Sequence, residues 1–194
     1  NYSTTEEYER FNAMGVTQYG QMTAGSYMYI GPQGIVHGTT ITLMNAARLK
    51  FGLSSDSNLG GMRFVTSGLG GMSGAQAKAA VIAGASCIVA ESNPVAAQKR
   101  HDQGWVDHLS YDVDEAIDIM INASEEKKGC SVGYVGNIVD LWERLVARDV
   151  YVHLGSDQTS LHNPYQGGYF PAGLRFEDGQ RLMHEEPSKF KEMV

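Results

Sequence analysis

A glycine-rich turn between an apolar strand and an alanine-rich helix constrains the fold of this 194-residue chain most strongly. Gly68, Gly70 and Ser73 follow the spacing G-x-G-x-x-G, with serine at the third position. Glycine suits the tight turn and the closest backbone approach to a pyrophosphate, whereas the third position needs only a small residue. The unpaired amides that open the following helix attract phosphate groups. The motif therefore predicts a strand–turn–helix unit that binds a dinucleotide.

Strands and helices alternate on both sides of this turn. Strands are predicted at 63–66, 85–90, 105–109, 130–135 and 150–154. Helices are predicted at 6–19 after the cap Thr5, at 35–51, 73–83 and 94–100, from the cap Asp112 to 127, at 138–148, and as two short helices near the end. This alternation indicates an α/β fold with a Rossmann-like, doubly wound, mostly parallel sheet and flanking helices. We expect one dinucleotide-binding domain over 1–194, made of a helical lead-in (1–60), a βαβ core (61–155), and a polar loop with terminal helices (156–194).

Glu91 ends the next predicted strand, 23 residues after Gly68. A carboxylate about 20 residues beyond the first glycine accepts hydrogen bonds from the adenosine ribose, and it repels the 2′-phosphate of NADP. The turn and this acid together therefore favour NAD as the cofactor. The alternative is a purely structural turn, with Glu91 at a strand end and no ligand. No Gly-x4-Gly-Lys-Ser/Thr segment occurs, which excludes a P-loop.

Composition argues against several other classes of partner. The formal net charge is −7, which disfavours nucleic acids and anionic membranes and requires local groups to hold an anion. No apolar run approaches the length of about 20 residues that spans a membrane. Cys87 and Cys130 lie in apolar strands, where buried reduced thiols are expected, and we infer a reducing cytoplasm. The histidines lack the spacing of metal ligands, so no metal site is predicted.

A polar loop follows the last predicted strand and carries many hydrogen-bonding side chains. It covers 155–164 and is followed by the aromatic residues Tyr165, Tyr169 and Phe170. Loops after parallel strands form the ligand crevice of such sheets, so this loop is predicted to line the site. An ordinary solvated loop is the alternative, and His162 has no evident partner that would make it a base.

Four longer segments resemble the urocanase family, in the same order and at matching spacing. They are QMTAGS at 21–26, YIGPQGIV at 29–36, TSGLGGMSGAQ at 66–76 and DQTSLHNP at 157–164. The resemblance covers essentially the whole chain. It implies the NAD-binding portion of a longer, cytoplasmic, homodimeric enzyme of histidine breakdown that hydrates urocanate. In that family a tightly held NAD+ acts as an electrophile and carries no hydride.

The family's NAD contacts coincide with the glycine turn and the acid that the residues alone indicate. Together with Gly68 and Gly70, the predicted cofactor-binding set is Gln21, Gly71, Met72, Ser73, Glu91, Asn137, Ile138, Gln158, Thr159, Ser160, Leu161, His162, Tyr169 and Phe170. His162 is in addition a candidate contact to the nicotinamide side. Many bacterial members carry an arginine contact where this chain has Ala96, so that adenosine contact is either missing or supplied by Lys99 or Arg100.

The resemblance also limits what this chain is expected to do. The family's catalytic cysteine lies in a core domain formed by segments before and after this one, and neither Cys87 nor Cys130 matches it. We therefore expect NAD+ binding with little or no hydratase activity. An NAD-dependent dehydrogenase domain is one alternative, but it needs a proton-relay group beside the nicotinamide, and only His162 is available. A non-enzymatic nucleotide-sensing or assembly module is the other, and it would bind NAD+ weakly and reversibly.

Overall fold

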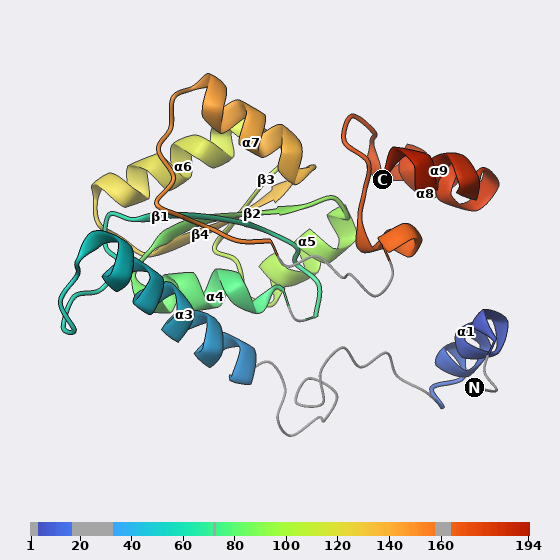
Figure 1. The fold of residues 1–194 in the computed structure, drawn as a ribbon, viewed down its shortest axis with the longest axis horizontal. Coiled ribbons are helices and arrows are strands. Elements are labelled where there is room, and N and C mark those ends of the chain that lie inside the picture. Colours follow the sequence, from blue (N-terminus) through green and yellow to red (C-terminus); the bar gives the residue numbers. More distant parts are fainter. Residues whose placement is uncertain (1–3, 17–32, 72, 158–163) are drawn as a thin grey trace.

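A parallel β-sheet forms the centre of the protein. The computed structural model describes residues 4–16, 33–71, 73–157 and 164–194. Within these residues the sheet has five strands, all parallel, in the order β3-β4-β2-β1-β5 (Figure 1). The strands are β1 (Arg63–Ser67), β2 (Ser86–Glu91), β3 (His108–Ser110), β4 (Cys130–Val135) and β5 (Leu154–Gly155). The chain moves outward from β1 and then crosses back to place β5 on the other side of β1, which confirms the predicted doubly wound α/β fold.

Helices cover both faces of this sheet. The helices of the described residues are α1 (Thr5–Ala13), α3 (Gln33–Phe51), α4 (Ala75–Ala83), α5 (Pro94–Asp102), α6 (Val113–Glu125), α7 (Ile138–Ala147), the π-helical turn η1 (Pro164–Gly168), α8 (Phe176–Glu185) and α9 (Pro187–Met193). On one face lie α4 and α5, with α3 packed on the outer side of α4; on the opposite face lie α6 and α7 (Figure 1). The three C-terminal helical segments pack on one another. Of the described helices, none is both long and apolar enough to cross a membrane.

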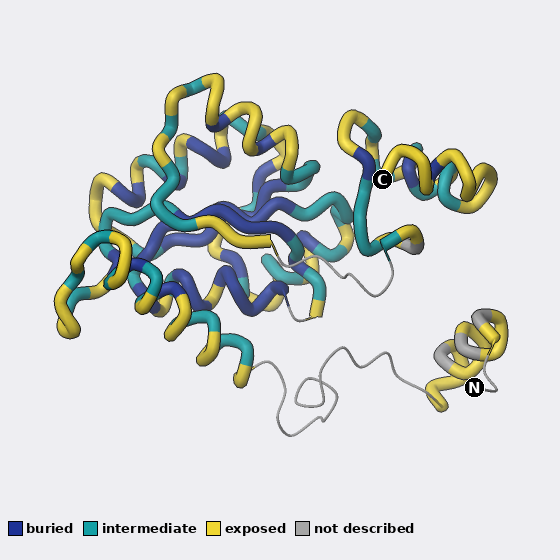
Figure 2. The backbone as a smooth tube through the Cα atoms, viewed as in Figure 1, coloured by how far each residue is buried: buried dark blue, intermediate teal, exposed yellow. Residues whose placement is uncertain are grey.

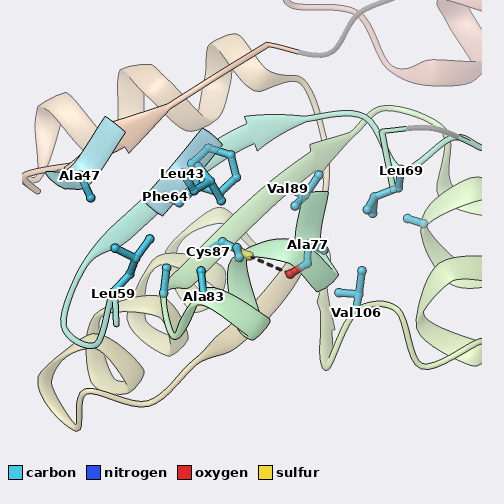
Figure 3. Close-up of a cluster of buried hydrophobic side chains, with 13 residues drawn as sticks. Leu43, Ala47, Leu59, Phe64, Leu69, Ala77, Ala83, Cys87, Val89 and Val106 are labelled. Atoms are coloured by element: carbon cyan, nitrogen blue, oxygen red, sulfur yellow. Dashed lines mark hydrogen bonds between the residues drawn. The ribbon is translucent and has the colours of Figure 1, made fainter. Parts of the chain in front are cut away.

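Two clusters of buried apolar side chains hold the helices to the sheet. The first joins α3 and α4 to one face of the sheet around Phe64, Cys87 and Val89 (Figure 3). The second joins α6 and α7 to the other face around Val65 and Ile88. Consecutive residues of β1 and β2 therefore alternate between two buried faces, as parallel strands covered by helices do. Figure 2 shows this burial along the central strands and along most of α4.

Local sequence sets the ends of the core helices. α4 stops where Gly84 takes a left-handed backbone, with φ of 91°, which glycine adopts without strain. α6 starts where the Asp112 carboxylate accepts hydrogen bonds from the amides of Asp114 and Glu115. The predicted cap Asp112 and the predicted stop at Gly84 are thus confirmed.

Both edge strands are shorter than predicted. β3 begins at His108 and not at 105, because the preceding residue pairs through its side chain. The Asp107 carboxylate accepts hydrogen bonds from the amide and the hydroxyl of Ser131 at 2.9 and 2.8 Å. β5 contains only Leu154–Gly155, so the prediction of a strand over 150–154 is largely wrong.

The start and end of the first helix also differ from the prediction. Thr4 and not Thr5 caps it, because the Thr4 hydroxyl accepts from the Glu7 amide at 3.2 Å while the Glu7 carboxylate accepts from the Thr4 amide at 3.1 Å. The helix ends at Ala13, short of the predicted 19, and positions 17–19 lie outside the described residues.

Candidate functional site

A cavity of about 580 Å³ opens at the carboxyl ends of β1, β2, β4 and β5. Parallel sheets of this class bind their ligands at that edge. Of the predicted cofactor-binding residues, those that line the cavity are Gly68, Gly70, Gly71, Ser73, Glu91, Asn137, Ile138, Tyr169 and Phe170. The other predicted contacts lie outside the described residues; they are Gln21, Met72, Gln158, Thr159, Ser160, Leu161 and His162.

The glycine turn leads directly from β1 into the first turn of α4. Gly68 has φ of 89°, a conformation that favours glycine, and its amide donates to the Ala90 carbonyl at 2.8 Å. The Gly70 amide donates to the Ser73 hydroxyl at 3.1 Å, so serine at the third motif position accepts a hydrogen bond within the turn. Gly70, Gly71 and Ser73, which lead into α4, line the cavity, whereas Gly74 and Ala75 at the start of the helix line a smaller hollow beside Arg100. The positive end of the helix dipole therefore lies just beyond the turn in an acidic protein.

The requirement for a minimal side chain lies at Gly74 and not at the third motif position. A Cβ atom at Gly74 would stand 2.8 Å from Nε of Arg100 and 2.9 Å from the Gly70 carbonyl oxygen. Ser73 itself is buried, with its hydroxyl accepting from the Gly70 amide, and that a small residue suffices at the third motif position stays a prediction. The close approach of the Arg100 side chain and the Gly70 carbonyl to the start of α4 depends on glycine at position 74.

Glu91 occupies the position that its spacing predicts, beside the glycine turn. One carboxylate oxygen accepts from the Leu69 amide at 2.6 Å, and the other accepts from the Asn93 amide at 2.9 Å. These two bonds fix the carboxylate at the cavity wall. Each oxygen keeps a further lone pair, so the fixed group still accepts hydrogen bonds from two hydroxyls of a ligand.

A polar cluster between β1, α4 and β5 was not among the predicted site residues. The hydroxyls of Thr66 and Ser156 donate to Oε1 of Gln76 at 3.1 and 2.8 Å and lie 2.8 Å from each other. Beside them the Ser67 hydroxyl donates to the Asp157 carboxylate at 2.6 Å. The signal for this cluster is a glutamine in the second position of an alanine-rich helix whose other residues, apart from the exposed Lys78, are apolar.

Residues 167–170 of the C-terminal segment line the side of the cavity opposite the glycine turn. Asn137 binds this segment to the start of α7. Oδ1 of Asn137 accepts from the Val139 amide at 3.0 Å and so caps α7, while Nδ2 donates to the Phe170 carbonyl at 3.0 Å. The Phe170 ring stacks on Phe176 with centroids 5.3 Å apart and meets Phe190 edge-on at 6.1 Å. One side chain thus joins the second face of the sheet to the aromatic core of the C-terminal helices.

The candidates for a replacement of the family's arginine do not line the cavity. Ala96 lies in the first turn of α5, where its amide donates to the Asn93 side chain. Lys99 is exposed, and the Arg100 guanidinium binds carbonyl groups of the glycine turn. The described cavity lining therefore contains no arginine or lysine from α5.

Both cysteines are buried on strands, as predicted, and neither lines the cavity. Burial, then repulsion from Cys130 and Asp107, raises the pKa of the Cys87 thiol far above its usual range. Burial, then Asp107, also raises the pKa of Cys130. Thiols held in the protonated form are poor nucleophiles, so neither residue is a catalytic candidate.

Comparison with known proteins identifies the family. The model of the urocanase Rossmann-like domain matches residues 31–194, and that of the urocanase N-terminal domain matches residues 1–28. Probable urocanate hydratases of Dictyostelium discoideum and Caenorhabditis elegans are 61% and 57% identical over 195 residues, and the urocanate hydratase of Mus musculus is 54% identical over 199. Each alignment covers 100% of this chain but only 28% or 29% of the relative. The chain belongs to the urocanase family.

Proposed function

We propose that this chain is the NAD+-binding part of a urocanate hydratase, the enzyme that adds water to urocanate to give 4-imidazolone-5-propionate. The observation that carries the proposal is a single cavity bordered both by the glycine turn that leads into α4 and by the fixed carboxylate of Glu91. These are the two groups that a dinucleotide requires, one for its pyrophosphate and one for its adenosine ribose.

The residues present fit this cofactor. Gly71 has open space where a Cβ atom would stand, so a phosphate has access to the backbone there. The adenosine ribose would lie at Glu91, and the other half of the dinucleotide would lie toward Asn137 and Tyr169. Contacts from Gln21, Met72 and residues 158–162 are part of the proposal.

The chain's own part in the reaction is to bind and orient the cofactor. When bound, NAD+ supplies an electrophilic ring for the substrate. The described cavity offers hydrogen-bonding groups but no cysteine, and the chain spans 28% or 29% of the length of its curated relatives. We therefore assign the groups that bind urocanate and move protons to the remainder of a longer, cytoplasmic, homodimeric enzyme.

Replacing Glu91 tests the cofactor assignment, because the two pyridine dinucleotides should respond in opposite directions. Glu91→Gln removes the charge that holds the ribose hydroxyls and repels a 2′-phosphate. We expect NAD+ affinity to fall by about tenfold, the effect of one lost charged hydrogen bond, while NADP+ affinity rises. Isothermal titration calorimetry measures both dissociation constants.

Glu115→Gln is the matched control. Glu115 also accepts a hydrogen bond at the end of a strand, from Ser110, but it does not line the cavity. Both affinities should stay at their original values in this variant. Failure of the unaltered protein to bind NAD+, or equal losses for both dinucleotides in Glu91→Gln, would contradict the proposal.

A further inference from the structure

Arg100 of α5 binds the glycine turn from the side opposite the cavity. Its Nε donates to the Leu69 carbonyl at 3.0 Å, and its Nη2 donates to the Gly70 carbonyl at 3.0 Å. Its Nη1 donates to the Gln103 side chain at 2.6 Å, which holds the guanidinium in place. Arg100 is half-buried and lines a smaller hollow behind the turn.

Two successive peptide groups therefore have their carbonyls fixed toward the arginine. In a trans peptide the carbonyl and the next amide point in opposite directions. The Leu69 carbonyl shares its peptide group with the Gly70 amide. That amide donates to the hydroxyl of Ser73, a residue of the cavity lining. The Gly70 carbonyl shares its peptide group with the Gly71 amide. Because the carbonyl faces Arg100, the Gly71 amide points away from Arg100.

Glu91 and Arg100 hold the same segment of the turn from its two sides. The Leu69 amide binds the Glu91 carboxylate at 2.6 Å, and the Leu69 carbonyl binds the arginine. Gly74 makes room for this arrangement, because a Cβ atom there would stand 2.8 Å from the arginine Nε. The turn thus has its orientation set by charged side chains on both sides.

We propose that Arg100 is a positioning residue for the pyrophosphate of the cofactor. It acts through the backbone: by fixing the Leu69 and Gly70 carbonyls it orients the Gly70 amide, which donates to Ser73, and turns the Gly71 amide toward the cavity side of the turn. The inference rests on the proposed function, since it names the residue that orients the phosphate-binding backbone. It gives Arg100 a role different from that of a direct contact to the adenosine half.

The competing explanation is a simple attraction between the guanidinium charge and the phosphates. Replacing Arg100 by lysine distinguishes this attraction from the orientation of the backbone. Arg100→Lys keeps the positive charge but loses the planar fork that binds two carbonyls at once. Arg100→Met removes both the charge and the fork. If orientation is what matters, both variants should bind diphosphates poorly; if charge is what matters, only the methionine variant should.

The experiment compares ADP with adenosine in the full chain, with ligand-observed NMR used for the weaker adenosine. We expect both Arg100 variants to bind ADP about tenfold more weakly while adenosine affinity is unchanged. Lys78→Met is the matched control, because Lys78 is a cation on α4 that donates to the Gly104 carbonyl and does not contact the turn. It should leave both affinities unaltered.

Each other outcome overturns the inference in a distinct way. Retained ADP affinity in Arg100→Lys would identify a charge effect, and retained affinity in Arg100→Met would show that the turn needs no external support. Equal losses for ADP and adenosine would mean that the variants damage the site as a whole. Absence of ADP and NAD+ binding by the unaltered protein would reject the proposed function itself, independently of the variants.

Discussion

His153 joins the edge strand β5 to β1 through its side chain as well as its backbone. Its Nδ1 accepts from the Arg63 amide at 3.0 Å, and its own amide donates to the Arg63 carbonyl at 3.0 Å. Phe51 and Tyr151 meet the imidazole edge-on, with centroids 5.7 and 5.0 Å away. An accepting Nδ1 requires the neutral ring, and burial, then the Arg63 charge, lowers the pKa of His153 below its ordinary 6.5.

A lowered pKa of a base makes stability depend on pH in one direction. The unfolded chain binds a proton at His153 below about pH 6.5 while the folded chain resists it, so the free energy of unfolding should fall as pH drops through that value. Above that range His153 contributes no pH dependence. Urea denaturation at about pH 7.5 and about pH 5.5 measures the loss.

His153→Asn provides the control for this prediction. Its amide oxygen replaces Nδ1 as an acceptor for Arg63 but does not titrate. The variant should therefore lose less stability than the unaltered protein over the same pH interval. Equal losses in both proteins would show that other groups cause the pH dependence.

The residues that the sequence could identify are those with a local pattern. Glu91 follows from its spacing after Gly68, and the glycine turn follows from its motif. Arg100 has no such signal, and Gln76 has only its polarity within an alanine-rich helix. The partners of both lie in other segments of the chain, and a side-chain bond between distant segments leaves no periodicity. Gly74 shows the same limit, since the need for glycine there arises from Arg100.

Asn137, the residue that caps α7, has both a local and a distant role. Asn137 caps the helix through Oδ1 and holds the C-terminal wall through Nδ2. Asn137→Asp keeps the capping acceptor and loses the donor, so the helix should persist while residues 164–194 open more often. Loss of one hydrogen bond predicts hydrogen exchange about fivefold faster in that segment, measured by mass spectrometry.

Asn93→Asp is the matched control for this element. Asn93 caps α5 in the same way, accepting from the amides of Val95 and Ala96 at 3.0 and 3.4 Å. Within the described part of the chain its side chain makes no hydrogen bond to the C-terminal helices. Exchange in residues 164–194 should not change in this variant. The role of Asn137 as an attachment would be rejected if its aspartate variant also left that exchange unchanged.

Elements with a long apolar pattern were predictable, and short edge elements were not. The apolar runs of β2 and β4 and the capped helix α6 match their predicted positions closely. β3 and β5 are shorter because Asp107 and His153 use side chains where a ladder would use backbone groups. A pattern of apolar residues does not show where a side chain takes the place of a backbone group in the hydrogen bonding of a sheet edge.

At the scale of the whole molecule, the proposal predicts a cofactor-binding unit without turnover. The chain incubated with NAD+ and urocanate should leave the ultraviolet absorbance of urocanate unchanged, because its described cavity contains no catalytic candidate. A full-length urocanate hydratase, such as the Mus musculus relative, should consume urocanate under the same conditions. Turnover by the chain alone would contradict the assignment, and accumulation of NADH would favour a dehydrogenase.

The sequence predicts the class of the molecule but not its complete arrangement. Alternating strands and helices imply a parallel sheet, yet they do not reveal that β4 lies between β2 and β3. That order depends on which strand buries both faces best, a property of the assembled layers. The position of α8 and α9 depends on Phe170, Phe176 and Phe190, whose contact no spacing rule predicts.

The alanine-rich helix α4 is confined between α3 and the sheet, with Ala77, Ala79 and Ala80 fully buried. Small side chains leave almost no room for the helix to tilt or slide, so its first turn has one available position. If the cofactor binds as proposed, the glycine turn before α4 needs little reordering, and little ordering entropy opposes binding. The alanines of α4 thus keep the preceding glycine turn at one position relative to the sheet.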